Sequence, residues 1–443
     1  MQQQIIQQII QEAQQMKLDR LAVGAGVALG CSNGMRLTRR LVLLGTASAT
    51  LGFAAMPVLG QSKPIRIGVS TAMQLQVGRD TQDALKMAVD DINARGGVLG
   101  RQLEMVVADE TESPETGISA IKKLTADEKV DVLIGGYTSG VTLAQLPHIS
   151  AAKTIYLNVG SASPATNARV KTDYDNYKYV FRVGPLNSAH QARELTGFIS
   201  NFVKGELGLD KIAIVGENAK WVQDLVPLLK KGAVAAGADV RSTEFFDAQT
   251  SDFSPLFSKV KSSGAQYMVV VLSHASSDIF AKQWYDSRFP MPYGGIDVKS
   301  MDGDFCDRIG GKSVGEMAAN FAVRAPLTAR TIPFFDKFRE LTKRSPVYTA
   351  FGANDAVYIY ADAVERANST DTEAVIKALE STSYEGITGI VEFDDTHDVK
   401  PGTPTFKGPS LLLAQWQEGC KREVIYPKNL RTAAFVYPEW IKK

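Results

Sequence analysis

Residues 88–101 read AVDDINARGGVLGR, and this stretch decides the fold. It closes an amphipathic segment, residues 79–95, whose apolar side chains recur at helical spacing on one face (Leu85, Ala88, Val89 and Ile92). Gly96-Gly97 is a typical helix stop. Runs that favour strands lie on either side, at 65–69 and 103–108, so the region predicts a strand–helix–strand unit.

The same alternation continues along the chain. Further strands are predicted at 130–134, 154–157, 211–215 and 266–272, and helices at 115–125, 141–152, 221–236, 253–261 and 276–286. Strands that alternate with helices of this length imply parallel sheets covered by helices on both faces. The sequence therefore predicts an α/β protein of two doubly wound lobes, with a ligand cleft between them.

Composition excludes several classes of protein. With 443 residues, 44% hydrophobic and 22% charged, the chain has ordinary globular composition and ample length for two or three domains. Its 49 basic and 48 acidic residues leave no excess charge to attract nucleic acid. Three scattered cysteines and four histidines, no two of them four residues apart, favour neither a metal site nor a cofactor.

The first sixty residues are interpreted as a leader. Residues 41–60 carry no charge and follow a basic segment with Arg39-Arg40, as in a twin-arginine or Sec export signal. Cleavage after Gly60 would give a periplasmic protein. Residues 1–34 are interpreted as an upstream stretch that is included because the start codon was assigned too early. An uncleaved membrane anchor is the alternative, whereas Leu29 makes a lipid anchor at Cys31 a poor match.

Catalytic motifs are poorly matched in this sequence. Gly310–Ser313 looks like the end of a phosphate-binding loop, but Cys306 stands where its first glycine belongs. Residues 135–140 follow a strand without forming a dinucleotide fingerprint, and no nucleophile elbow occurs. The sequence therefore predicts a protein that is not an enzyme, with no catalytic residue. An exported hydrolase that uses Ser139 and a distant histidine is the remote alternative.

Four stretches together resemble one family. Residues 88–101 are similar to the AVxxINAxGGVxGR signature of type I periplasmic solute-binding proteins, the leucine/isoleucine/valine-binding family of ABC importers. Asp109 with Pro114 resembles the family's D-x4-P segment, residues 134–140 its ligand loop, and residues 179–182 its YxFR strand. The resemblance covers residues 63 to about 420.

The resemblance implies two lobes joined by three crossovers that close on a small solute and deliver it to an ABC permease in the inner membrane. On this basis residues 61–183 and about 324–386 form the first lobe. Residues 184–323 and about 387–443 form the second. Whether Cys306 and Cys420 pair in the oxidising periplasm is left open by the sequence.

Ligand-binding positions follow from the resemblance and from strand ends. The predicted set is Thr138, Ser139, Ser161, Ser163, Trp221, Ser273, His274 and Asp297. Thr138 and Ser139 would offer hydroxyls to a carboxylate beside a helix start, with simple helix capping as the alternative. Ser161 and Ser163 resemble the second ligand loop. Trp221 would cover the solute, or else pack in the core.

The remaining predicted positions lie in the second lobe. Ser273 and His274 follow a strand at its carboxyl end, where open α/β sheets bind ligands. Asp297 lies near the place where the family puts an acid for an ammonium group, although it could equally be a solvated loop residue.

One departure bears on the solute. Family members often carry a disulfide between the D-x4-P segment and the ligand loop, whereas residues 110–113 contain no Cys and Thr138 stands in the loop. We expect a branched-chain or related amino acid, with amides, urea or aromatic carboxylates as alternatives. A ligand-sensing regulator of the same fold is the alternative from another class.

Overall fold

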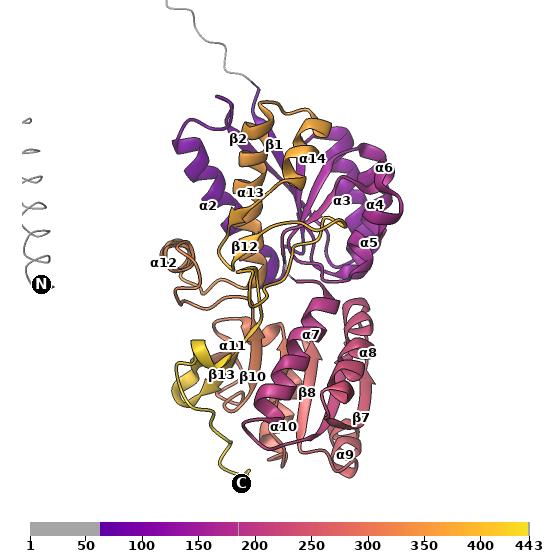
Figure 1. Ribbon diagram of the computed structural model, residues 1–443, viewed down its shortest axis with the longest axis vertical. Helices are drawn as coiled ribbons and strands as arrows, with labels where there is room; N and C mark the ends of the chain where they lie inside the picture. Colours follow the sequence, from indigo (N-terminus) through magenta and orange to yellow (C-terminus); the bar gives the residue numbers. More distant parts are fainter. Residues whose placement is uncertain (1–62, 185, 442–443) are drawn as a thin grey trace, which may run out of the picture. The chain divides into compact units, whose positions relative to one another are not determined.

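The first sheet lies immediately after the predicted leader. The structure, a computed structural model, describes residues 63–184 and 186–441, so the predicted export signal lies outside the described residues. Five parallel strands lie side by side in the order β2-β1-β3-β4-β5 (Figure 1). They are β1 (Ile65–Thr71), β2 (Leu103–Asp109), β3 (Val132–Gly135), β4 (Ile155–Asn158) and β5 (Val180–Arg182).

Helices from two distant parts of the chain pack against this sheet. The early helices are α2 (Gln76–Ala94), α3 (Pro114–Lys122), α4 (Ser139–Ala152), α5 (Ala165–Thr172) and α6 (Tyr174–Tyr177), and a π-helical turn, η1 (Lys123–Asp127), continues α3. The later ones are α12 (Thr331–Thr342), α13 (Tyr348–Ala367) and α14 (Thr372–Glu380). Helix α13 lies along α2 (Figure 1), where Thr349 Oγ1 donates to the Val77 carbonyl at 2.9 Å.

The second sheet has seven strands in the order β14-β13-β10-β9-β8-β6-β7. Its strands are β6 (Lys211–Glu217), β7 (Asp239–Phe246), β8 (Tyr267–Leu272), β9 (Tyr293–Asp297), β10 (Met317–Asn320), β13 (Leu412–Gln417) and β14 (Lys421–Tyr426). Its helices are α7 (Ser188–Phe198), α8 (Lys220–Ala235), α9 (Ser254–Ser262), α10 (Ser276–Asp286) and α11 (Phe305–Arg308). Shorter elements are η2 (Ile199–Lys204), η3 (Lys299–Met301), η4 (Glu418–Cys420) and η5 (Lys428–Leu430).

The sequence pattern did not reveal every strand of this sheet. Strand β7 is a polar edge strand that is mostly half-buried or exposed, so it lacks a continuous apolar run. Strand β9 carries Gly294-Gly295, which weakens its strand propensity. A Cβ at Gly295 would lie 2.1 Å from the Val270 carbonyl oxygen. Strands β13 and β14 are antiparallel, with β13 paired to β10, so the sheet is parallel only in part.

The chain passes between the two sheets three times. It crosses after β5, after β10, and again before β13, with the two-stranded ribbon of β11 (Tyr384–Glu385) and β12 (Ile390–Val391) preceding the last crossing. We call each sheet with its packed helices a lobe. The exact lobe boundaries given above stay a prediction.

Buried polar contacts tie the last crossover to the first lobe. The Arg182 side chain is fully buried and forms an ion pair with Asp398, with 2.9 Å between Nε and Oδ1. The Arg182 amide also donates to the His397 carbonyl at 2.9 Å. Residues near 397 therefore lie against β5.

Cys306 and Cys420 form a disulfide, which answers the question the sequence left open. The two residues are 114 positions apart, with 5.6 Å between their Cα atoms. The bond joins α11 to the turn between β13 and β14, next to the buried Trp416 ring. It fixes a segment that follows directly on the loop after β9.

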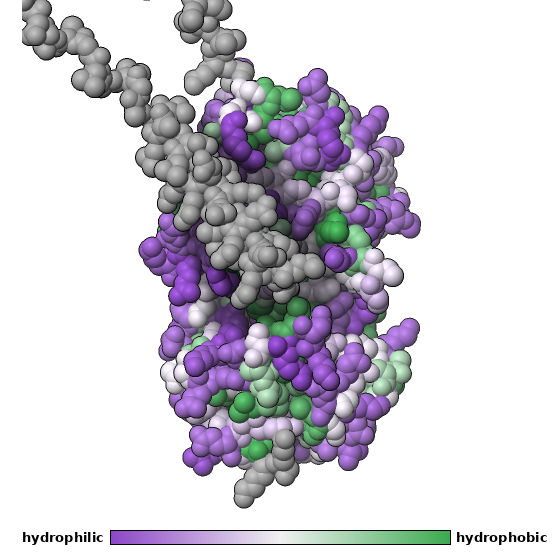
Figure 2. All heavy atoms as spheres, turned by 60° about the vertical axis from the view of Figure 1, so that its left-hand side comes forward, coloured by the Kyte–Doolittle hydropathy of each residue, from purple (hydrophilic) through white to green (hydrophobic). Residues whose placement is uncertain are grey.

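Apolar side chains are largely internal. Figure 2 shows hydrophilic residues over most of the described surface on one face, with apolar residues in separate patches. The large hydrophobic residues left exposed are Leu99, Tyr174, Leu228, Val234, Phe245, Leu341 and Val436. Among residues 63–184 and 186–441, no helix is both long and apolar enough to cross a membrane.

Candidate functional site

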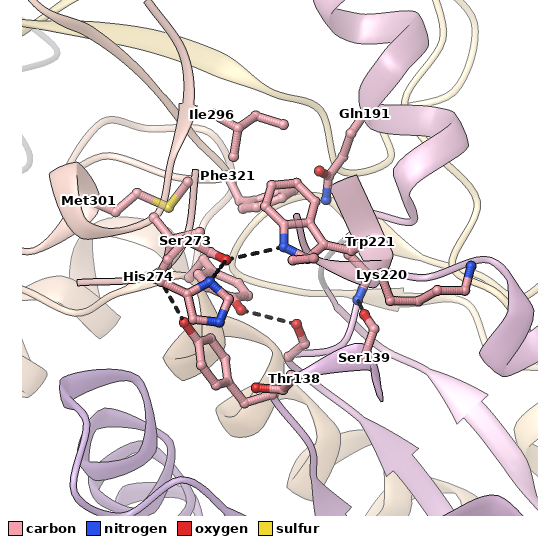
Figure 3. A pocket seen from close by; sticks show the side chains of 16 residues that line it. Thr138, Ser139, Gln191, Lys220, Trp221, Ser273, His274, Ile296, Met301 and Phe321 are labelled. Atoms are coloured by element: carbon pink, nitrogen blue, oxygen red, sulfur yellow. Dashed lines mark hydrogen bonds between the residues drawn. The ribbon is translucent and has the colours of Figure 1, made fainter. Parts of the chain in front are cut away.

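A cavity lies between the two lobes, lined by loops that follow the carboxyl ends of strands from both sheets (Figure 3). The space between the lining side chains is about 540 Å³, including the part open to solvent. First-lobe residues that line it are Tyr137, Thr138, Ser139, Gly160, Ala162 and Tyr348; second-lobe residues are Gln191, Ala219, Lys220, Trp221, Ser273, His274, Ile296, Val298, Met301 and Phe321.

Glycine at 136 shapes the first-lobe loop. Its φ is +84°, and a Cβ there would lie 2.2 Å from the Tyr156 hydroxyl oxygen. Only glycine allows this backbone at such close approach. The chain therefore turns sharply after β3 and delivers Tyr137, Thr138 and Ser139 to the cavity before α4 begins.

The Ser139 hydroxyl holds the two first-lobe loops together. Its Oγ accepts hydrogen bonds from Ser161 Oγ at 3.2 Å, from the Ala162 amide at 3.3 Å and from the Ser163 amide at 3.1 Å. The proton of Ser139 has no acceptor among the described residues. A solute carboxylate could accept it, close to backbone N–H groups at the start of α4 that also carry partial positive charge.

Thr138 is the N-cap residue of α4 by position, but its side chain makes no capping hydrogen bond. Instead its hydroxyl donates to Glu112 Oε1 at 3.4 Å. The Thr138 side chain therefore does not cap the helix. Its hydroxyl joins the ligand loop to the loop after β2.

Ser161 and Ser163 are fully buried and are not among the lining residues. The Ser161 hydroxyl donates to Ser139, as described above. The Ser163 hydroxyl donates to Asp224 Oδ2 at 2.6 Å, so it bonds the first lobe to α8 of the second. Both serines lie directly behind the cavity wall.

Trp221, Ser273 and His274 meet in one hydrogen-bonded group with Glu217. Trp221 Nε1 donates to Ser273 Oγ at 3.2 Å, and Ser273 Oγ donates to Glu217 Oε1. His274 Nδ1 lies 2.8 Å from the same carboxylate oxygen, and the His274 amide donates to Oε2 at 3.0 Å. These bonds fix the indole ring over the cavity (Figure 3).

The charges in this group support each other. Burial acts to raise the pKa of Glu217, but hydrogen bonds from His274 and Ser273 outweigh it and lower that pKa below its ordinary value. The hydrogen bond to Glu217 raises the pKa of His274, against the opposing effect of burial. Because Nδ1 faces Glu217, His274 has only Nε2 left for a solute.

Asp297 does not line the cavity, although its neighbours Ile296 and Val298 do. The carboxylate is fully buried; Ser277 Oγ donates to Oδ2, and the amides of Lys299 and Ser300 donate to Oδ1 at 3.0 and 3.2 Å. Burial raises the pKa of Asp297 to about 6 despite these bonds. Its visible task is to hold the loop after β9.

Several lining residues lay outside the sequence-based set. Phe321, Tyr348, Met301 and Gln191 come from segments far apart in the chain, and only the tertiary fold brings them together. Tyr137 stands within the quoted ligand loop, and its hydroxyl donates across the cleft to the Ser273 carbonyl at 3.3 Å. Glu217 ends β6, a position that the strand-end rule could have found.

The described part of the chain contains no group of three or more His, Cys, Asp or Glu side chains placed to hold a metal ion. Ser273 Oγ lies 3.3 Å from His274 Nδ1, the same nitrogen that lies 2.8 Å from Glu217 Oε1, whereas in a catalytic triad the serine and the acid contact different nitrogens of the histidine. The arrangement instead offers hydroxyl and amide donors at one end and aromatic and aliphatic walls around them.

Comparison with known proteins agrees with this geometry. Residues 64–417 match the model of a family described as periplasmic binding protein. This chain belongs to that family. The relatives it resembles include binding proteins of branched-chain amino acid ABC transporters, so the solute-binding function and the type I two-lobe fold predicted from the sequence are confirmed.

Individual relatives are distant in sequence, but their alignments cover most of this chain and nearly all of each relative. The chain is 25% identical over 371 residues, 82% of its length and 94% of the relative's, to the leucine-, isoleucine-, valine-, threonine-, and alanine-binding protein of Pseudomonas aeruginosa. A branched-chain amino acid transporter substrate binding protein from Streptococcus pneumoniae, solved with isoleucine, matches with a TM-score of 0.69 at 22% identity, covering 82% of this chain and 100% of that one.

A second solved relative binds a different solute. The solute binding protein of an ABC transporter from Rhodopseudomonas palustris, in complex with 3,4-dihydroxy benzoic acid, also matches with a TM-score of 0.69. It is 18% identical, over 81% of this chain and 94% of that one. At these identities the structural likenesses establish the fold, and the family's name implies a periplasmic location.

Proposed function

We propose that this chain is exported to the periplasm, captures a small solute with a carboxylate and an apolar body, and delivers it to an ABC permease in the inner membrane. A branched-chain amino acid is the first candidate. The observation that carries the proposal is the pairing of the Ser139 hydroxyl with apolar walls in one cavity between two lobes. The named relatives from P. aeruginosa and S. pneumoniae support it.

The carboxylate is assigned to the Ser139 end for electrostatic reasons. That end offers a free hydroxyl proton and the start of α4, a 14-residue helix whose first N–H groups carry partial positive charge. The apolar body would then extend toward Met301, Phe321 and Trp221. Tyr137 and Tyr348 close the same space from the first lobe.

An aromatic carboxylate is the second candidate. Four aromatic side chains line the cavity (Tyr137, Trp221, Phe321 and Tyr348), and flat rings stack well on such walls. The dihydroxybenzoate-bound relative supports this reading. Amides and urea lack the carboxylate that the Ser139 end is suited to bind, so they rank lower.

We further propose that the solute leaves the cavity unchanged. The Ser139 hydroxyl is hydrogen-bonded to a serine and two amides, and no hydrogen bond joins it to a histidine in the described part of the chain. It therefore lacks the adjacent base that would make it a nucleophile.

A solute screen tests this function. Purified residues 61–443 would be heated with amino acids, 2-hydroxy acids, aromatic carboxylates, amides and urea, and each compound would be assayed afterwards for consumption. A solute at one hundred times its dissociation constant adds about 2.7 kcal/mol of stability, a shift that such a screen detects. We expect a carboxylate to stabilise the protein and to be recovered intact. Stabilisation by amides or urea alone, or consumption of the solute, would overturn the proposal.

A further inference from the structure

A second hollow adjoins the cavity and shares Tyr137, Ser273 and His274 with it. Two charged side chains line this hollow, Glu112 from the first lobe and Lys299 from the second. The cleft therefore continues past Tyr137 into a space with a charged lining, whereas the first cavity has no acidic side chain among its described lining residues.

Glu112 is held beside the ligand loop. Its Oε1 accepts a hydrogen bond from the Thr138 hydroxyl at 3.4 Å, while Oε2 has no hydrogen-bond partner within residues 63–184 and 186–441. The side chain is half-buried and lines the second hollow, from which a solute could reach it. Its negative charge acts on side chains of both lobes: after the larger effect of burial it raises the pKa of Tyr137 and Tyr348 in the first lobe, and after the larger effect of the Glu217 hydrogen bond it raises the pKa of His274 in the second.

Two other acids near the cleft, Asp297 and Glu217, already have hydrogen-bond partners. Asp297 is fully buried, and its two oxygens take three hydrogen bonds from Ser277, Lys299 and Ser300. Glu217 is fully buried against Ser273 and His274. An ammonium group needs an acceptor that it can reach without breaking such bonds, because leaving buried donors unpaired costs free energy. Of these three acids, Glu112 alone meets that condition.

We propose that Glu112, rather than Asp297, receives the ammonium group of an amino-acid solute whose carboxylate lies against Ser139. This assignment rests on the proposed function. It is geometrically consistent because Thr138, which holds Glu112, directly precedes Ser139 in the loop, and the two charged groups of an α-amino acid share one carbon atom. Lys299 lines the same hollow from the second lobe, and its positive charge disfavours an ammonium placed beside it, whereas Glu112 attracts one.

The test compares two solutes that differ in one group. L-leucine carries an ammonium where L-2-hydroxy-4-methylpentanoate carries a hydroxyl, and both keep the carboxylate and the side chain. Calorimetry would measure both with the wild type, with Glu112→Gln and with Asp297→Asn. Glu418→Gln, an exposed acid between β13 and β14, is the control for loss of one negative charge.

We expect Glu112→Gln to weaken the affinity for leucine about ten- to a hundredfold, which is the range for losing a hydrogen bond to a charged group. The affinity for the hydroxy acid should change by no more than about twofold, and this retained binding also shows that the variant is folded. Glu112→Asp, which keeps the charge, should recover part of the leucine affinity. Glu418→Gln should bind both solutes as the wild type does.

Other outcomes overturn the inference in recognisable ways. If Asp297→Asn selectively loses affinity for leucine while Glu112→Gln binds leucine as the wild type does, the ammonium lies at Asp297. A wild type that binds the hydroxy acid but no amino acid would refute the role of Glu112 while leaving carboxylate capture intact. A wild type that binds no carboxylate in the screen would refute the proposed function itself.

Discussion

Replacing Ser139 by Ala tests the carboxylate end of the cavity. The change removes the acceptor of two amides, Ala162 and Ser163, at 3.3 and 3.1 Å, and of the Ser161 hydroxyl at 3.2 Å. It also removes the one hydroxyl proton assigned to the solute. A lost hydrogen bond to a charged group costs about 1.5–3 kcal/mol, so the dissociation constant should rise about ten- to a hundredfold.

The same variant should also be less stable without solute. Buried donors left without an acceptor cost about 1–3 kcal/mol, and water in the adjacent cavity should keep the loss near the lower end of that range. Urea unfolding would measure this loss, and calorimetry with the cognate solute would measure affinity. Thr138→Val is the matched control, since it removes a hydroxyl that bonds to Glu112 rather than to the 161–163 loop.

Two results would refute this reasoning. If Ser139→Ala binds the solute as tightly as the wild type, the carboxylate lies elsewhere. If a carboxylate without an ammonium group loses as much affinity in Thr138→Val as in Ser139→Ala, the two hydroxyls do not have the separate tasks assigned here.

Three further predictions concern stability. Because Glu217 raises the pKa of His274 above its ordinary 6.5, their contact stabilises the fold fully below about pH 6.5, as long as Glu217 stays ionised, and loses effect as pH rises through the raised pKa. His274→Gln should therefore cost more stability at pH 6 than at pH 9, and equal costs in urea unfolding would contradict this. Burial raises the pKa of Glu110 to about 8, so its neutral form is favoured in the fold and stability falls from about pH 4.5 to 8. Glu110→Gln should flatten that fall in a series of unfolding measurements; an unaltered slope would argue against a neutral Glu110. Replacing Cys306 and Cys420 by Ser opens a link between residues 114 positions apart and should cost about 2–5 kcal/mol, which an unchanged urea midpoint would disprove.

The fold could be predicted because its signals are local. Residues 88–101 sit at the end of α2 and the approach to β2, where helix periodicity and a glycine stop coincide. The alternation that follows fixes parallel pairing. Strands β7 and β9 escaped the pattern because one is a polar edge and the other contains two glycines. Their pairing depends on neighbours distant in the chain, which no local window contains.

The site was predictable where a strand end or a loop motif marks it. Thr138, Ser139, Trp221, Ser273 and His274 all line the cavity. Ser161, Ser163 and Asp297 lie near it, but their side chains are turned to partners within the protein, and side-chain direction cannot be read from spacing alone. The ligand roles of all eight residues stay predictions.

Glu112 shows what a departure from a family pattern can signal. The sequence shows no cysteine between Glu110 and Ser113, so the family's disulfide to the ligand loop cannot form. In the structure a hydrogen bond from Thr138 to Glu112 joins these two segments instead. A covalent link would carry no charge, whereas this pair adds a carboxylate at the edge of the cleft. The sequence could reveal the missing disulfide, but only the tertiary contact shows where the new charge lies.

A crystal structure of residues 61–443 with the carboxylate found by the screen tests the central claim most directly. We predict the solute between the two lobes, its carboxylate within hydrogen-bond distance of Ser139 Oγ and its apolar body against Trp221 and Phe321. Solute density outside this cavity, or a carboxylate turned toward Lys299 with Ser139 uncontacted, would contradict the account.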